Sequence, residues 1–237
     1  MAISGSTNFS MTCSEIISSS FRILGVGMNG ETPTAEESNN ARQVLNMLLK
    51  FHSKKALKLW MVRTQSIIPV AGVATYTLGV AGSVVMPRPV SIISVYRKEI
   101  NGSALILDPL SFDDYQMLPT KSSAGIPSQY VYDQQLNAGK LILWPVPDTA
   151  APTTYTIEVN YKKPIDDVDN VTDDIEIPQE WYMPLRWALA YDLMAEFDLP
   201  PDKQNRISSK SQRLIEEVQE LDIEEGTSLY IHPMRRL

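Results

Sequence analysis

The side chains that most often catalyse reactions or bind metal ions are few in this sequence. It has two histidines, His52 and His232, and one cysteine, Cys13, far apart along the chain. A structural zinc site of the usual kind needs four Cys or His ligands, which this inventory cannot supply within one chain. Because His52 lies between apolar residues and lysines, we expect a structural histidine on the surface or half-buried.

Acidic side chains form the densest group of potential ligands. They are Asp166, Asp167, Asp169, Asp173, Asp174 and Glu176. So many carboxylates could bind Ca²⁺, but the spacing and central glycine of an EF-hand are absent. Two carboxylates could also hydrolyse peptidoglycan as a glycosidase does, although no partner spacing identifies such a pair. We expect a solvated acidic linker at 166–177, and neither a metal ion nor a cofactor.

The signatures of nucleotide-binding and hydrolytic sites are also missing. The sequence contains no P-loop, no GxGxxG after a strand, no GxSxG and no HExxH. Tryptophans could form a stacking platform for sugars or bases, but they more often anchor cores and interfaces, which is the interpretation we favour. They are Trp60, Trp144, Trp181 and Trp187. The sequence thus predicts a protein that is not an enzyme.

Charge argues against a protein whose main task is to grip nucleic acid. The net charge is −7, whereas DNA binding depends on Lys and Arg neutralising phosphates. Residues 1–65 carry +3 and residues 176–225 carry −7. One lysine cluster could touch DNA, but we favour a solvated helix end, where cations complement the helix dipole. It comprises Lys50, Lys54, Lys55 and Lys58.

Two N-terminal helices are expected, each with a capping box. Thr12 and Glu15 begin a helix over 12–24, and Gly25 ends it. Thr34 and Glu37 begin the second, longer helix. Its apolar stripe is predicted to be Ala41, Val44, Leu45, Leu48, Leu49 and Phe51.

The middle of the chain has the pattern of short β-strands, typical of a small sandwich or barrel. Asn101-Gly102 predicts a type I′ hairpin turn between strands. Ser111 is a candidate N-cap for a short helix over 111–118. The expected strands are 64–70, 73–78, 90–99, 104–108, 129–133, 140–144 and 154–162.

Helical periodicity returns in the C-terminal third. We expect helices over 179–198 and 202–222, separated by a break at Pro200-Pro201 and ended by Gly226. Each helix at the two ends of the chain has one apolar stripe that must be covered, so we expect these helices to pack together. The predicted fold class is α+β: a helical bundle with an inserted antiparallel β domain and an extended tail. The predicted divisions are 1–62, 63–165, 166–177, 178–226 and 227–237.

Nothing in the sequence predicts export or membrane insertion. The start, MAISGSTNFSMTCSE, lacks the basic and apolar regions of a signal peptide. No stretch approaches the roughly 20 apolar residues that cross a bilayer. A single cysteine cannot form an intrachain disulfide, in keeping with a reducing site such as the cytoplasm.

The last eleven residues are a candidate binding segment. Free tails are normally poorer in apolar residues, and Tyr, Arg and Met are favoured in interfaces. We predict that this tail is the contact with a partner protein, and its folding back onto its own domain stays open as an alternative. The contact residues are Leu229, Tyr230, Ile231, His232, Met234, Arg235, Arg236 and Leu237.

The order of several motifs resembles a known family. ILGVG is followed by ETPTAEE, RPVSIISVYRK, DPLSFDDYQMLP, GIPSQYVYD, GKLILWPVPD and IEIPQEWYMPLRWALAYDLMAEF. This order, above all residues 143–147 and Ile177-Pro178, resembles the head-to-tail adaptors of short-tailed bacteriophages, also called tail accessory or packaged-DNA-stabilisation proteins. The resemblance covers roughly residues 12–225.

The resemblance implies a structural virion subunit assembled in the host cytoplasm. Such adaptors form a dodecameric ring below the portal protein, extend the channel through which double-stranded DNA passes without specific binding, and carry tail nozzle, fibre or spike proteins. The C-terminal tail typically reaches the portal, so residues 229–237 are the expected portal contact. One alternative is a different neck or tail-completion protein. A less favoured alternative is a virion-associated peptidoglycan hydrolase.

Overall fold

A computed structural model describes residues 5–26, 33–54, 59–149 and 153–221, and the statements below concern these residues. The chain divides into two compact units. Residues 1–59 and 165–237 form a helical unit, and residues 60–164 form a β unit. The predicted α+β class is confirmed by five α-helices and eleven strands among the described residues. No helix in these ranges is both long and apolar enough to span a membrane.

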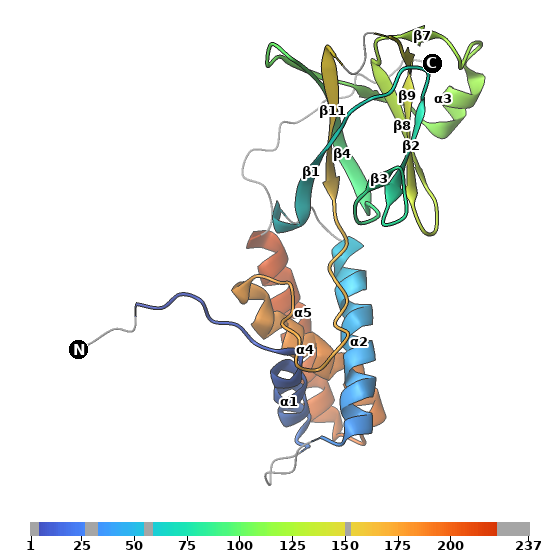
Figure 1. Cartoon of the computed structure of the whole chain (residues 1–237). Helices are drawn as coiled ribbons and strands as arrows, with labels where there is room; N and C mark the ends of the chain where they lie inside the picture. The colour runs from blue at the N-terminus through green and yellow to red at the C-terminus, as the bar shows by residue number, and fades with distance from the viewer. Residues whose placement is uncertain (1–4, 27–32, 55–58, 150–152, 222–237) are drawn as a thin grey trace. The chain divides into compact units, whose positions relative to one another are not determined.

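The helical unit combines elements from both ends of the sequence (Figure 1). In chain order they are α1 (Cys13–Leu24), α2 (Ala35–Lys54), η2 (Gln179–Trp181), α4 (Tyr182–Leu193), η3 (Met194–Glu196) and α5 (Pro201–Leu221). Helix α4 packs against α1, α2 and α5. It therefore joins two parts of the chain that are more than a hundred residues apart.

Both predicted capping boxes are present. The hydroxyl of Thr12 accepts a hydrogen bond from the amide of Glu15, whose carboxylate accepts one from the Thr12 amide at 2.9 Å. Thr34 and Glu37 make the same reciprocal pair before α2. Gly25 follows α1 with φ of 83°, a left-handed conformation that glycine adopts without strain.

The apolar stripe of α2 was predicted correctly except at its end. Ala41, Leu45 and Leu49 are buried, whereas Phe51 is 55% exposed. His52 takes the inward position instead and is buried, whereas we expected it on the surface or half-buried. The reason is helical phase: positions 41, 45, 48 and 52 follow the 3.6-residue period, and position 51 lies about 100° away.

Prolines shape the C-terminal helices as expected. Pro184 lies in the first turn of α4, where its missing amide proton is tolerated. Residues 197–200 are not helical, and Pro201 is the first residue of α5. Proline suits this position because its fixed φ matches the helix. Ile207 and Val218 are buried on the inner face of α5.

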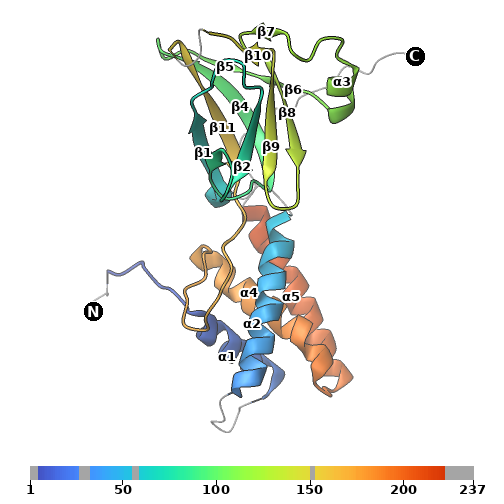
Figure 2. The same cartoon turned by 45° about the vertical axis from the view of Figure 1, so that its right-hand side comes forward.

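The β unit is a two-sheet sandwich with one short helix (Figure 2). Ser111 caps the helix through the amide of Asp114, as predicted. Trp144–Pro145 is a cis peptide bond. The elements are η1 (Leu59–Met61), β1 (Val62–Ile67), β2 (Thr75–Gly79), β3 (Val84–Val85), β4 (Ser91–Glu99), β5 (Ala104–Ile106), β6 (Asp108–Pro109), α3 (Phe112–Met117), β7 (Ala124–Gly125), β8 (Gln129–Gln134), β9 (Gly139–Trp144), β10 (Val146–Pro147) and β11 (Tyr155–Lys162).

The two large sheets have the orders β1-β11-β4-β5 and β3-β2-β9-β8-β6, and β10 and β7 form a small parallel pair. The long neighbours in both sheets are antiparallel. Buried and half-buried residues alternate along strand β11, because successive side chains point to opposite faces of the sheet. The alternation ends at the last two residues, which are both buried. The core between the sheets includes Leu78, Val95, Leu141, Tyr155 and Ile157.

The hairpin at Asn101-Gly102 exists, but its turn differs from the predicted one. The Gly102 amide donates to the Glu99 carbonyl at 2.9 Å, and the Glu99 amide donates to the Ser103 carbonyl at 2.8 Å. The loop therefore has three residues, 100–102, and only Gly102 among them is required to have positive φ, here 89°. The Asn101 side chain supports the turn by accepting from the Ser103 amide.

Candidate interaction surface

Helix α2 presents three different faces within the helical unit. Residues spaced by about 3.6 positions share a face. The first face carries the buried apolar stripe. The second carries Arg42, Asn46 and Lys50, each four positions from the next. The third carries Met47 and Phe51, which are 64% and 55% exposed.

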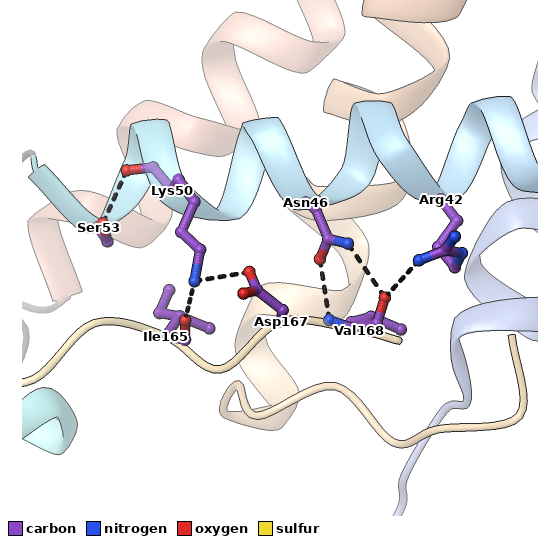
Figure 3. A network of polar contacts seen from close by, with 7 residues as sticks. All are labelled: Arg42, Asn46, Lys50, Ser53, Ile165, Asp167 and Val168. Carbon is purple, nitrogen blue, oxygen red and sulfur yellow. Dashed lines mark hydrogen bonds and ion pairs between the residues drawn. The ribbon is translucent and has the colours of Figure 1, made fainter. Parts of the chain in front are cut away.

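The second face of α2 holds residues 165–168, the first part of the acidic segment 165–177 (Figure 3). The Val168 carbonyl accepts hydrogen bonds from Arg42 at 2.9 Å and Asn46 at 3.0 Å, and the Val168 amide donates to Asn46 at 2.9 Å. Lys50 donates to the Ile165 carbonyl and pairs with Asp167 at 2.8 Å. The asparagine side chain thus binds the backbone as a β-strand partner would.

The other half of this segment contacts α1. The amides of Cys13 and Ser14 donate to the carbonyls of Asp173 and Val171 at 2.9 and 2.7 Å. Val168 and Ile175 are buried, whereas most of the carboxylates point to solvent. The expectation of a solvated linker therefore describes the acidic side chains but missed that the backbone is fixed on two helices. We call residues 165–177 the strap.

The third face of α2 lines a groove in the helical unit. Its volume is about 530 Å³, and α4 and α5 form its other walls. Met47, Phe51 and Tyr191 are exposed there, which is unusual for large apolar side chains gathered in one place. The remaining lining residues are Leu48, His52, Ala188, Asp192, Ser211, Gln212, Ile215, Glu216 and Gln219. We call this the α2/α4/α5 groove.

Three polar side chains of the groove, Asp192, Glu216 and Gln219, have few or no partners among the described residues. Asp192 makes no hydrogen bond or ion pair with any described residue, and desolvation raises its pKa above the usual range of a carboxyl even though much of the side chain is exposed. Glu216 accepts a hydrogen bond from Gln212 at 3.1 Å. The buried side-chain nitrogen of Gln219 has no partner in the described structure. Among the residues that the structure describes, no Lys or Arg lines the groove.

The candidate reactive groups have structural surroundings. Cys13 is fully buried, and burial raises the pKa of its thiol to about 11, far from the thiolate a nucleophile needs. His52 packs edge-on against Phe51 and contacts Trp181, with ring centroids 5.5 and 6.2 Å apart. Among the described residues, no three His, Cys, Asp or Glu side chains are grouped as metal ligands.

The tryptophans contribute to packing. Trp181 is buried. The indole nitrogen of Trp144 donates to the Thr120 carbonyl at 3.2 Å. The ring of Trp187 lies under the ammonium of Lys210 at 5.4 Å, a cation–π contact. Trp60 is half-buried.

The predicted contact residues of the tail all lie outside the described residues, as do Lys55 and Lys58 of the lysine cluster. Conversely, sequence reasoning missed the groove. It placed Phe51 in the core stripe and assigned no role to Met47, Tyr191 or Asp192. The signal present in the sequence was the spacing of Met47 and Phe51, two large apolar residues off the main stripe.

The described residues comprise a helical unit with the strap bound to it, a β sandwich and an exposed apolar groove. The profile of the SU10 adaptor protein family matches residues 11–236, and the chain belongs to this family of phage head-to-tail adaptors. No curated protein matches the sequence. Membership indicates a structural protein of the virion that associates with other virion proteins.

Proposed function

We propose that this chain is a subunit of a ring of about twelve copies that binds below the portal protein, extends the DNA channel and carries tail nozzle, fibre or spike proteins. The observation that supports this most is the family match over nearly the whole chain. The α2/α4/α5 groove adds a physical reason for association, because large exposed apolar side chains gain by losing water contact. Assembly would take place in the host cytoplasm.

Residues 229–237 are the proposed portal contact. They combine apolar, aromatic and cationic side chains, which interfaces favour. Ordering such a segment costs on the order of 10 kcal/mol of backbone entropy, so several side chains must act together. A chain ending at Gly226 should therefore keep its fold and lose portal binding.

Imaging of the purified chain with and without portal tests the ring. We expect discrete rings of portal symmetry only in the mixture, with two densities per subunit for the two units. Absence of any complex would overturn the portal assignment and would favour another neck or tail-completion protein. The chain ending at Gly226 is the matched variant: normal assembly with it would show that the tail is not the portal contact.

DNA should pass the ring without specific binding. Residues 176–225 carry a net charge of −7, and acidic surfaces repel phosphates. Binding in a mobility-shift assay should be weak, independent of sequence and lost at physiological salt. We also expect no hydrolysis of peptidoglycan or nucleotides above background. Turnover that disappears on changing one carboxylate of a folded protein would contradict this.

A further inference from the structure

The surface chemistry of the α2/α4/α5 groove specifies the kind of segment that could fill it. Met47, Phe51 and Tyr191 offer an apolar lining, and Asp192 adds a carboxylate that is partly desolvated and unpaired among the described residues. Such a carboxylate is stabilised when a guanidinium or ammonium group approaches it. The matching ligand is therefore an apolar segment that carries positive charge and no negative charge.

The buried nitrogen of Gln219 adds a second requirement. A buried donor without an acceptor costs free energy, which an occupant with a free carbonyl would recover. An extended peptide has such carbonyls along its backbone, whereas the outer surface of a helix has already used them. These two features together favour an extended segment over a docked helix.

One segment of this chain fits that description. Residues 227–237, TSLYIHPMRRL, contain five large apolar side chains, two arginines and no acidic residue. The other segments outside the described ranges are three to six residues long, and none has more than two large apolar side chains. The wall formed by α5 runs from Ser211 to Gln219, roughly 12 Å of helix at 1.5 Å per residue.

The described part of the chain also ends close to the groove. Helix α5 is described to Leu221, two residues beyond Gln219. Residues 222–226 can span up to roughly 17 Å, and Gly226 permits a sharp reversal. A tether this short keeps the tail at an effective concentration of about millimolar, so modest contacts suffice.

We propose that, in the isolated chain, residues 227–237 occupy the α2/α4/α5 groove of the same molecule. Arg235 or Arg236 faces Asp192, and apolar tail residues cover Met47, Phe51 and Tyr191. This goes beyond the proposed function and does not rest on it, because it concerns the chain before any partner binds. If the tail also binds portal, the groove and the portal compete for it.

Methyl-labelled methionine offers a direct test by NMR. The Met47 methyl resonance should differ between the full chain and a chain ending at Gly226, and the synthetic peptide TSLYIHPMRRL should restore its position when added to the shorter chain. Met117 of the β unit, 80% exposed, is the internal control and should not move. An unchanged Met47 resonance in both comparisons would overturn the proposal.

Charge variants and dilution complete the test. Asp192→Asn should weaken peptide binding by about tenfold, the loss expected for one charge-assisted hydrogen bond, whereas Glu196→Gln outside the groove should not. In the full chain the Met47 shift should be independent of protein concentration. A shift that disappears on dilution would overturn the proposal and assign the groove to a second copy of the chain. None of these outcomes depends on whether portal is bound.

Discussion

The two units of this chain solve the problem of burying apolar surface in different ways. The β unit is continuous in sequence, and its two sheets enclose a core to which both contribute. The helical unit is assembled from both ends of the sequence through α4, and one strap of irregular backbone is bound to α1 and α2. Its exposed groove is the part of that unit that remains uncovered in the described structure.

The difference indicates where each unit gains its stability. In the sandwich, cross-strand pairs and apolar burial supply most of it. In the helical unit, side chain–backbone hydrogen bonds must fix a segment that has neither helix nor strand structure. Removing a polar side chain should therefore lower the free energy of unfolding more in the helical unit than in the sandwich. Truncating a buried apolar side chain should lower it in the sandwich at least as much as in the helical unit.

The largest effect is expected from Leu141→Ala in β9. Leu141 is fully buried between the sheets, so truncation removes apolar contacts and leaves a cavity. We expect the free energy of unfolding of the β unit to fall by about 2–5 kcal/mol. Chemical denaturation followed by the fluorescence of the tryptophans measures it.

Leu136→Ala is the matched control for that prediction. Leu136 lies between β8 and β9 and is 90% exposed. The same chemical change should then alter stability by less than about 0.5 kcal/mol. Equal effects of the two substitutions would mean that the sandwich core does not dominate the stability of this unit.

A smaller effect is expected from Asn46→Ala on the strap. Asn46 binds both the amide and the carbonyl of Val168, and only the carbonyl keeps another donor, Arg42. The Val168 amide, left unsatisfied, should cost about 1–3 kcal/mol of helical-unit stability. Hydrogen exchange at Val168 should accelerate in parallel. Gln43→Ala, on the exposed surface of the same helix, should change neither quantity.

The sequence predicted most of the helices and long strands because their signals are local. Capping boxes at Thr12 and Thr34, the N-cap at Ser111 and the break at Pro200-Pro201 all depend on neighbouring residues. The two-residue strands β3, β6, β7 and β10 were not predicted, because they depend on pairing with distant strands. The hairpin turn was found, but its length depends on strand register, which the dipeptide alone does not set.

The candidate site was harder to predict for the same reason. Groove residues come from α2, α4 and α5, and no pattern within one helix shows that three helices leave a space between them. The strap was missed because Val168 and Ile175 are isolated apolar residues among acids, which resembles a solvated loop in composition. Only the tail was identified as a binding segment from composition alone, and its role stays a prediction.

The ion pair of the strap should contribute less than the Asn46 contacts. Lys50 and Asp167 lie 2.8 Å apart, but their side chains are 41% and 59% exposed, so water and salt screen the interaction. A double-mutant cycle with Lys50→Met and Asp167→Asn should give a coupling of about 0.2–1 kcal/mol that decreases with added salt. A coupling above that range, or one insensitive to salt, would mean that the strap is held mainly by charge.

The smallest effect, and the one that best distinguishes a filled groove from an empty one, is expected at Asp192. Desolvation raises its pKa in the folded chain, so the folded state binds a proton more readily than the unfolded state. The charged carboxylate therefore destabilises the fold at neutral pH, and this penalty disappears as the pH falls below the unfolded pKa of about 3.9.

In a chain ending at Gly226, Asp192→Asn should thus raise stability at pH 7 by about 0.5 kcal/mol or less, and the gain should vanish in acid. In the full chain the gain should be smaller or reversed, because an arginine of the tail offsets the desolvation of the carboxylate. Thermal unfolding of the four proteins at pH 7 and in acid provides the comparison. An equal gain in both chains at pH 7 would show that no cation reaches Asp192. The groove would then stay uncovered in the free protein, unlike the core of the sandwich.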